Sequence, residues 1–472
     1  MNVTRRQWIQ QLSSGVGGIG LAAYLSQAGI LNAQQTEAVT GQQTPGPHHT
    51  PRARSLIFLN MMGGPSQFET FDYKPEMDRR AGENITVTGG RVIGNTPIMP
   101  SQWRLARHGQ AGHWVSEILP YIATCADDLC MIKSMVCDDN NHPGGQRQIM
   151  TGYNRQVMPS FGSWILYGLG VANRNLPGFV HLAEGTHHGS GFLPAETQGM
   201  PLGNRMPNLN RPGNISAQTQ REQLDLIQQL NQNHLQNHPG ENDLAARIEA
   251  GELAFRMQMA APEALDISRE SASTLALYGI TGTEGRQTRS GGGRNGLQET
   301  TASYGTMCLL ARRLVEREVR VITINVGGRR GWDQHNRLKD TIAHNASVID
   351  QPIAGLLTDL KSRGLLDSTL VLWGGEFGRT PNMQSLNGDS RAHFVNGYTM
   401  WLAGGGVRPG LEYGKTSELG SEVVENRVHV NDLHATILHL MGLDPDRLTY
   451  RYGGREQKLT DLHGRVVLGI LA

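Results

Sequence analysis

IDQPIAGLLTDLKSRGLLDSTLVLWGGEFGR, residues 349–379, is the stretch that decides the fold class of this chain. Its first half repeats apolar residues at helical spacing and stops at Gly364, which predicts a helix over residues 349–363. Its second half holds a short apolar run, residues 369–373, that ends at two glycines and Glu376. A wholly apolar strand directly after a helix is typical of a parallel sheet that is covered on both faces.

The same alternation of helices and apolar strands extends along the chain. It predicts strands at residues 55–62, 128–136, 179–182, 319–326 and 398–402, and helices at residues 308–316 and 431–442. Two further helices around Pro239-Gly240 predict a helical insertion at about residues 217–262 that covers one side of the sheet. We therefore expect one α/β domain over residues 54–472, with a mostly parallel central sheet flanked by helices.

The N-terminal segment has the features of an export signal. Arg5-Arg6 is followed by Trp8-Ile9 and by a weakly apolar, Gly/Ala-rich stretch up to Ala33. This pattern resembles a twin-arginine signal peptide over residues 1–33, with an ordinary secretory signal or a plain amphipathic helix as alternatives. Residues 34–53 are polar and Pro-rich, which predicts a flexible linker. No later run reaches about 18 apolar residues, so we expect no transmembrane anchor after cleavage. Export by the twin-arginine route would place the protein in the periplasm or at the cell surface.

Composition argues against several classes of protein. Among 472 residues, 43 Lys and Arg balance 42 Asp and Glu, so the net charge is +1. Nucleic-acid binders usually carry a basic excess, and we expect no nucleic acid as partner. Four cysteines do not make a disulfide scaffold in so long a chain, although Cys125 and Cys130 could pair after export. The 17 histidines invite a search for a metal site, but His429, His434 and His439 fall at helix-like spacing and are interpreted as packing or surface residues.

Candidate metal ligands lie at the ends of predicted strands. Asp333 and His335, two residues apart, follow one strand, Glu376 follows another, and His393 precedes a third. The carboxyl ends of parallel strands converge at one edge of a sheet, so these side chains could share a cation. Carboxylate and imidazole ligands suit Zn²⁺, Mn²⁺ or Fe, and Ca²⁺ less well.

The motifs of the chain, taken together, resemble a known family. Residues 348–379 look like the C-terminal metal segment of sulfatases. From about residue 45 to the C-terminus, the chain resembles the bacterial domain of unknown function 1501 family, within the alkaline-phosphatase/sulfatase superfamily. The motifs that carry this resemblance are GGPSQFETFD at residues 63–72, Asn141-His142, WDQH at residues 332–335, GEFGRTP at residues 375–381 and MWLAGGG at residues 400–406. The resemblance implies an alkaline-phosphatase-like fold.

Position by position, the resemblance implies one metal held by Asp333, His335 and His393. A second metal of the superfamily is held by an Asp-His pair, and this chain has Glu376 and Phe377 at those positions. The N-terminal Asp that completes the second site has no clear match. Two acidic residues of the first glycine-rich motif could reach back to it, Glu69 or Asp72.

Candidate catalytic residues follow from the same comparison. The formylglycine motif of sulfatases is missing, because His142 stands where its Cys or Ser would be. His142 could be a metal ligand, a general base or a nucleophile, or it could cap the next helix. Arg379 could bind a phosphate or sulfate oxygen, or pair with Glu376. Ser66 could assist through its hydroxyl group, or serve as a turn residue.

The leading hypothesis is an exported metal-dependent hydrolase of a phosphate or sulfate ester, divergent from classical sulfatases. An anionic ester of a saccharide or another extracellular polymer is one candidate substrate. The departures at His142 and Phe377 keep an alternative open, a non-catalytic relative that binds a ligand or partner through a degenerate metal site. A scaffold in an export-linked complex is a third hypothesis.

Overall fold

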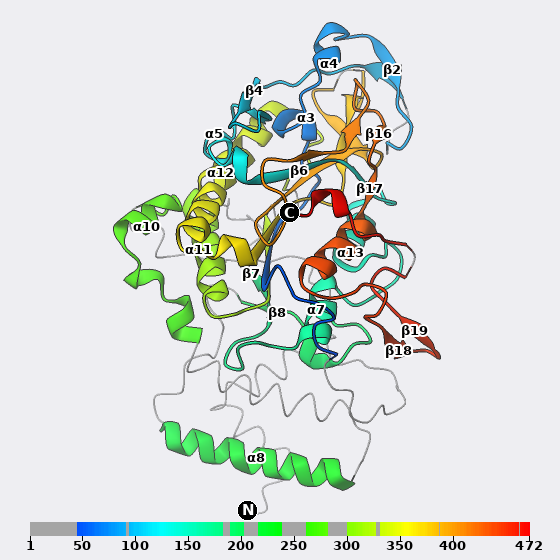
Figure 1. The fold of residues 1–472 in the computed structure, drawn as a ribbon. Coiled ribbons are helices and arrows are strands. Elements are labelled where there is room, and N and C mark those ends of the chain that lie inside the picture. The colour runs from blue at the N-terminus through cyan, green and yellow to red at the C-terminus, as the bar shows by residue number, and fades with distance from the viewer. Residues whose placement is uncertain are drawn as a thin grey trace, which may run out of the picture.

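A computed structural model describes residues 45–90, 94–182, 189–202, 216–237, 261–281, 300–326, 331–386, 388–461 and 463–472 (Figure 1). The predicted signal peptide, residues 1–33, lies outside these described residues, as does most of the second helix of the predicted insertion. The centre of the domain is a nine-stranded sheet with helices on both faces.

The sheet is almost entirely parallel. Its strand order is β14-β6-β13-β10-β1-β9-β7-β8, and β17 also pairs with β6. Strand β13 is antiparallel to both its neighbours, β10 and β6, and the other described pairs are parallel. The strands are β1 (Ser55–Met61), β6 (Leu129–Val136), β7 (Phe179–Leu182), β8 (Met200–Pro201), β9 (Val321–Val326), β10 (Thr369–Gly374), β13 (Tyr398–Ala403), β14 (Glu412–Tyr413) and β17 (Val428–His429). The predicted α/β class is confirmed.

Alternate residues of the central strand β1 enter two separate cores. Ile57 and Leu59 pack into the core that contains α11 (Thr301–Val315) and α12 (Leu338–Ser362). Leu56 and Phe58 point the other way, into the core formed with α7 (Phe161–Leu169) and α13 (Val430–Leu440). This two-sided burial explains why the strands are apolar throughout instead of alternating with polar residues. Figure 1 shows the two helix layers on opposite sides of the strands.

Smaller elements surround the sheet. The helices among them are α3 (Gln67–Thr70), α4 (Pro75–Arg79), α5 (Pro120–Ala123), α6 (His142–Thr151) and α10 (Ala272–Leu277). The antiparallel pairs are β2 (Asn84–Thr86) with β3 (Asn95–Pro97), β4 (Leu105–His108) with β5 (His113–Ser116), β11 (Gly378–Met383) with β12 (Arg391–Phe394), β15 (Lys415–Thr416) with β16 (Val423–Glu425) and β18 (Tyr450–Tyr452) with β19 (Arg455–Gln457).

Helix α12 starts eleven residues before the predicted start at residue 349. Its first turns carry several polar residues, which hide the helical pattern in the sequence. In the structure, Leu338, Ile342 and Ala346 recur at four-residue spacing and are buried, so these turns already face the core. Pro352 lies inside the helix and does not end it.

Two peripheral segments differ from expectation. Residues 45–53, the described end of the predicted linker, lie along the domain, where His48 N–H donates to the Gly442 carbonyl (2.8 Å) and Arg52 N–H to the Leu440 carbonyl (2.9 Å). The predicted insertion contributes helix α8 (Ala217–Asn237), which lies at the end of the molecule beyond α7 and away from the sheet faces in Figure 1. Helix α8 therefore does not lie over the sheet, whereas Ala261, at the other end of the predicted insertion, is buried in the core with α11 and α12.

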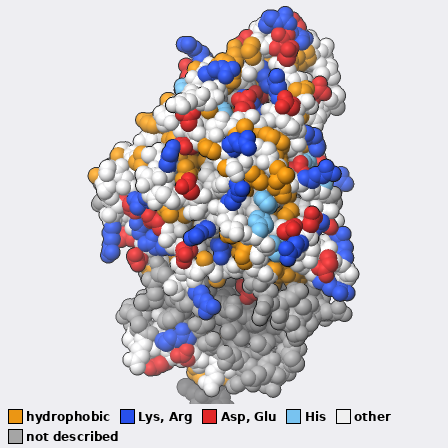
Figure 2. All heavy atoms as spheres, in the orientation of Figure 1, with side chains coloured by type: hydrophobic (Ala, Val, Ile, Leu, Met, Phe, Trp, Pro, Cys, Tyr) orange, Lys and Arg blue, Asp and Glu red, His pale blue; other side chains and the backbone are white. Residues whose placement is uncertain are grey.

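The surface charge, the cysteines and the hydropathy of the described helices can be compared with what the composition predicts. Blue and red side chains are interspersed on the face drawn in Figure 2, as the balanced charge predicts. All four cysteines are buried and free, so the pairing considered for Cys125 and Cys130 is not formed. Among the described helices, none has the length and apolar character needed to span a membrane.

Candidate metal centre

Four potential metal ligands meet at the carboxyl edge of the sheet. They are His142, Asp333, His335 and His393, whose ligand atoms all lie within 4.8 Å of one another. His142 begins α6 directly after the β6 loop, and Asp333 and His335 follow β9. His393 comes from the β11-β12 hairpin, which follows β10. The sequence predicted three of these four as ligands, and left ligand, base or nucleophile open for His142.

One carboxylate oxygen is the centre of the cluster. Asp333 Oδ1 lies 3.1 Å from His142 Nε2, 2.8 Å from His335 Nε2 and 3.0 Å from His393 Nε2. Ligand atoms of a tetrahedral zinc ion are about 3.3 Å apart, given Zn–N and Zn–O distances near 2.0 Å. The three imidazoles thus surround the carboxylate at nearly the spacing that a shared ion would impose.

The outer nitrogen of each imidazole faces a hydrogen-bond acceptor. His142 Nδ1 lies 2.6 Å from Glu376 Oε1, His335 Nδ1 lies 2.6 Å from Gln384 Oε1, and His393 Nδ1 lies 2.7 Å from the Asn140 carbonyl oxygen. Each Nδ1 therefore carries a proton and donates it outward, and each Nε2 faces Asp333 Oδ1. A metal that replaced the protons on Nε2 would find all three rings already oriented by their outer hydrogen bonds, so this arrangement fits a metal.

The pKa values of these groups reflect the same need for positive charge. Burial lowers the pKa of His142, but the neighbouring Asp333 and Glu376 carboxylates outweigh it and raise this pKa to about 9. Burial also acts on Asp333, yet hydrogen bonds from the three histidines hold the pKa of its carboxyl far below the usual range. Burial lowers the pKa of His393, which favours the neutral ring that a metal requires.

Glu376 lies behind His142 and outside the four-residue set. Its Oε1 accepts the His142 Nδ1 proton and the Gly63 N–H (3.0 Å), while Oε2 accepts from Gln146 Nε2 (2.5 Å). The carboxylate is almost completely buried and its lone pairs are occupied by these donors. Its geometry is that of a group that orients His142, whereas the sequence analysis had named Glu376 as a metal ligand.

Arg379 points into the protein. Its side chain is 1% exposed, and its guanidinium donates to the carbonyls of Gly64 (2.9 Å), Trp332 (3.0 Å) and Gly63 and to Asp333 Oδ1 (3.0 Å). These bonds join the strand-end loops of β1 and β9 and fix the Asp333 carboxylate. Arg379 therefore has a positioning geometry instead of the predicted contact with a substrate oxygen, and its ionic partner is Asp333, not Glu376.

Other candidates from the sequence lie away from the cluster. Ser66 is fully buried, and its hydroxyl donates to the carboxylate of Glu69. Glu69 in turn forms a buried ion pair with Arg391 (2.7 Å), and Asp72 pairs with Lys74 (3.2 Å). Neither carboxylate belongs to a group of potential metal ligands among the described residues.

Phe377 contributes an apolar ring to the cluster, at a position where a metal ligand was considered. Its ring stacks on His393 at 4.6 Å between centroids and lies 5.0 Å from His142. Phe377 stands where the resemblance implied a histidine of a second metal site, and its ring packs against two imidazoles of the cluster. The described residues thus offer one four-residue centre at this edge.

Gly63 makes the close approach of these loops feasible. Its φ is 112°, and a Cβ there would lie 2.4 Å from Asp333 N. We expect Gly63→Ala to lower the free energy of unfolding by at least about 1–3 kcal/mol from backbone strain, and to weaken metal binding because Asp333 must move. Gly82→Ala is the matched control, since Gly82 also has positive φ (80°) but nothing within 4 Å of its added Cβ. Equal losses of metal in both variants would contradict this interpretation; denaturant unfolding and elemental analysis measure them.

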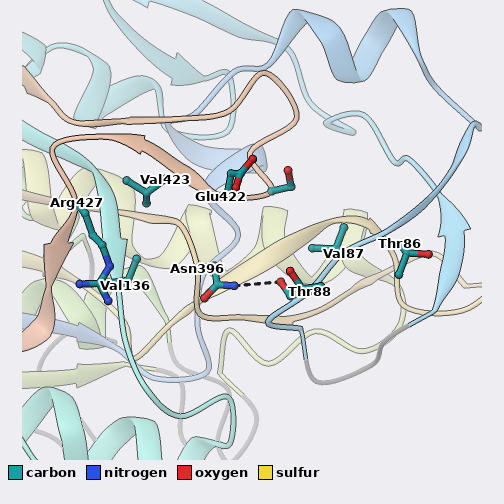
Figure 3. A pocket seen from close by; sticks show the side chains of 9 residues that line it. Thr86, Val87, Thr88, Val136, Asn396, Glu422, Val423 and Arg427 are labelled. Atoms are coloured by element: carbon teal, nitrogen blue, oxygen red, sulfur yellow. Dashed lines mark hydrogen bonds between the residues drawn. The ribbon is translucent and has the colours of Figure 1, made fainter.

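A surface pocket elsewhere does not adjoin the cluster. It has a volume of about 330 Å³ and is lined by Thr86, Val87, Thr88, Val136, Asn396, Ser421, Glu422, Val423 and Arg427. Figure 3 shows the Asn396 amide donating to the Thr88 carbonyl, a 3.2 Å hydrogen bond between two of these lining residues. None of the four ligand side chains lines this pocket.

The sequence analysis missed the residues that hold the ligands in place. Gln384 and the Asn140 carbonyl orient His335 and His393, and Gln146 holds Glu376. Gln146 stands four residues after His142 in the same helix, so helical spacing could have paired them on one face. No local pattern marks Gln384 or Asn140, because their partners are distant in the chain.

Known structures resemble this chain only distantly. A protein in the alkaline phosphatase superfamily from Vibrio parahaemolyticus is 9% identical, with a TM-score of 0.37, covering 94% of this chain and 76% of that one. Ps i-CgsB is 12% identical, with a TM-score of 0.36 and coverage of 83% and 72%. Alkaline phosphatase from the Antarctic bacterium TAB5 is 12% identical, with a TM-score of 0.31 and coverage of 83% and 98%.

The family is established by sequence. No curated protein matches the chain. One family model, described as "Protein of unknown function (DUF1501)", matches residues 53–471, which is nearly the whole described domain. The motifs around His142, Asp333, Glu376 and His393 all fall inside this match. The chain therefore belongs to the DUF1501 family.

Proposed function

We propose that this protein is an exported metal-dependent hydrolase of a phosphate or sulfate ester. The observation that carries the proposal is the convergence of His142, His335 and His393 on Asp333, with each Nδ1 held by an acceptor. A set of imidazoles and one carboxylate suits Zn²⁺ or Mn²⁺ best. Export rests on the Arg5-Arg6 signal of the sequence.

Asp333, His335 and His393 are the proposed metal ligands. Catalytic zinc sites use three protein ligands and leave one position for water or substrate, whereas structural sites are closed by four. A metal bound by these three residues would lower the pKa of a bound water toward about 7 and polarise an ester oxygen. His142 would then remain free to act on the reacting atoms.

His142 and Glu376 form the proposed acid–base pair. Glu376 accepts the Nδ1 proton at 2.6 Å and thereby holds the ring with Nε2 toward the centre. With a metal bound and Nε2 unprotonated, Nε2 would take the proton of the attacking water, and the buried carboxylate would stabilise the resulting positive charge on the ring. The relation is that of an imidazole base and its orienting acid in a catalytic triad.

The substrate must reach a half-open centre. The side chains of Asp333, His142 and His335 are 22%, 28% and 33% exposed, so one side of the cluster meets solvent. An anionic ester group at the end of a larger molecule, such as a sulfated or phosphorylated saccharide, is compatible with this access. Arg379 is enclosed by carbonyls, so we assign the ester's negative charge to the metal and His142.

A specific observation favours the non-catalytic alternative. Phe377 packs on His142 and His393, and if His142 also coordinates the ion, the site has four protein ligands and no open position. Such a closed centre would stabilise the fold or bind a partner, without turnover.

His142→Ala separates the two functions. If His142 is the base, the variant keeps its metal while hydrolysis of aryl phosphate or aryl sulfate esters falls by about 10²–10⁴-fold. The test uses full-length protein loaded with Zn²⁺ or Mn²⁺, with elemental analysis beside the rate measurement. His49→Ala is the control, because His49 is exposed and remote from the cluster. Joint loss of metal and turnover would make His142 a ligand, and an inactive but metal-loaded wild type would favour the binding relative.

A further inference from the structure

A second group of potential ligands lies outside the proposed active centre. It consists of Asp138, His429 and His463, whose ligand atoms lie within 4.8 Å of one another. Asp138 follows β6, His429 ends β17 and precedes α13, and His463 belongs to the C-terminal segment. His429 is buried, whereas Asp138 and His463 are exposed. One potential ligand is therefore enclosed by the protein, and the other two are open to solvent.

The distances between the inner atoms match those around a metal ion. His429 Nε2 lies 3.2 Å from Asp138 Oδ2 and 3.4 Å from His463 Nε2. The corresponding separation around a tetrahedral zinc ion is about 3.3 Å. Two imidazoles and one carboxylate form a ligand set for Zn²⁺ or a similar transition metal, whose fourth position would be taken by water.

The protein holds two of these side chains rigidly. The Gln148 amide donates to Asp138 Oδ2, while its carbonyl oxygen accepts the Asp138 N–H (2.9 Å). His429 is fixed as the N-cap of α13, where its own N–H donates to Asp432 Oδ2 (2.8 Å). A ligand set that is positioned before the ion arrives loses less entropy on binding.

We propose that Asp138, His429 and His463 form a second binding site for a divalent transition metal such as Zn²⁺, independent of the centre at Asp333. Coordination through both Nε2 atoms places the ring protons on Nδ1. It gives up two hydrogen bonds to His429 Nδ1, from Asn431 N–H (3.2 Å) and from His463 Nε2 (2.7 Å), and the contact of His429 N–H with Asp432 stays.

The site ties together three distant parts of the chain. Asp138 begins the loop that ends at His142, and the Asn140 carbonyl of this loop holds His393. An ion at the second site therefore anchors the C-terminal segment and helix α13 to the loop that carries one residue of the active centre. Its expected effect is on metal content and on heat stability, since an ion that binds only the folded state raises the unfolding temperature.

The test removes the first centre and titrates Zn²⁺ into the full chain. The Asp333→Ala/His335→Ala variant, stripped with EDTA, is expected to bind about one equivalent in a calorimetric titration. Adding His463→Ala should weaken this binding by more than about 100-fold, because loss of an outer-sphere partner alone costs about 10–100-fold. Adding Asp138→Asn should act likewise, and adding His49→Ala should change nothing.

Two results would overturn the proposal. One is a stripped Asp333→Ala/His335→Ala variant that keeps its fold by circular dichroism but binds no Zn²⁺. The other is unchanged Zn²⁺ affinity after His463→Ala. Either would mean that the three groups form only a hydrogen-bonded chain, in which His463 Nε2 donates to His429 Nδ1 (2.7 Å) and His429 Nε2 donates to Asp138.

Discussion

Asp333→Asn is expected to remove one equivalent of metal from the protein and to abolish ester hydrolysis. Asp333 Oδ1 is the atom on which the three Nε2 atoms converge, so no other side chain can replace its charge. The amide that replaces it is neutral, and one of its two ends presents N–H groups to the ion. We expect a fall in turnover of at least about 10³-fold, measured beside elemental analysis of the same samples.

An acidic residue outside the centre serves as the control for this variant. Asp367 is exposed, and Asp367→Asn removes the same charge without touching the cluster. Its metal content and turnover should equal those of the wild type. Retention of full metal content by Asp333→Asn would refute the assignment of the centre, even if activity were lost.

The sequence predicted the sheet and the convergence of most of the candidate ligands for one physical reason. Apolar strand runs in an α/β domain are easy to recognise, and their carboxyl ends meet at one edge. Asp333 and His335 were therefore placed beside His393 without any knowledge of side-chain geometry. In the structure, the Nε2 atoms of His335 and His393 lie within 3.0 Å of Asp333 Oδ1.

The direction of individual side chains could not be predicted in this way. Arg379 and His393 are directly opposite each other in the β11-β12 pair, yet the histidine joins the cluster from within and the arginine reaches toward backbone carbonyls. Glu376 lies on the far side of His142 because the Gly63 N–H and Gln146 hold it there. Such choices depend on donors and acceptors that come from other parts of the chain.

The second cluster shows the same limit more clearly. His429, His434 and His439 suggested one helix face, and His434 is indeed buried, with Nε2 2.8 Å from the Ile149 carbonyl. His429 instead stands at the helix cap, and its partners Asp138 and His463 are 291 and 34 residues away in sequence. Spacing within one helix carries no information about such partners.

Arg379→Met is expected to produce the largest loss of stability of any single substitution at the centre. Methionine fills most of the space but removes the N–H groups that the carbonyls of Gly63 and Gly64 accept, and it leaves Asp333 without its cation. Removing one partner of a buried ion pair costs about 3–5 kcal/mol of unfolding free energy, which denaturant titration measures.

Arg379→Lys and Arg269→Met distinguish this cause from a general loss of charge. Lysine keeps the charge but is a point donor on a flexible stem, so it cannot span the same carbonyls, and we expect intermediate stability. Arg269 is 81% exposed, and its replacement by methionine should change the free energy of unfolding by no more than about 0.5 kcal/mol. If Arg379 acted on substrate instead, Arg379→Met would keep its stability and its metal and lose only turnover. The enclosure of the guanidinium by four carbonyls, including that of Arg391 (3.3 Å), and by Asp333 argues for the opposite result, in which stability and metal content fall together.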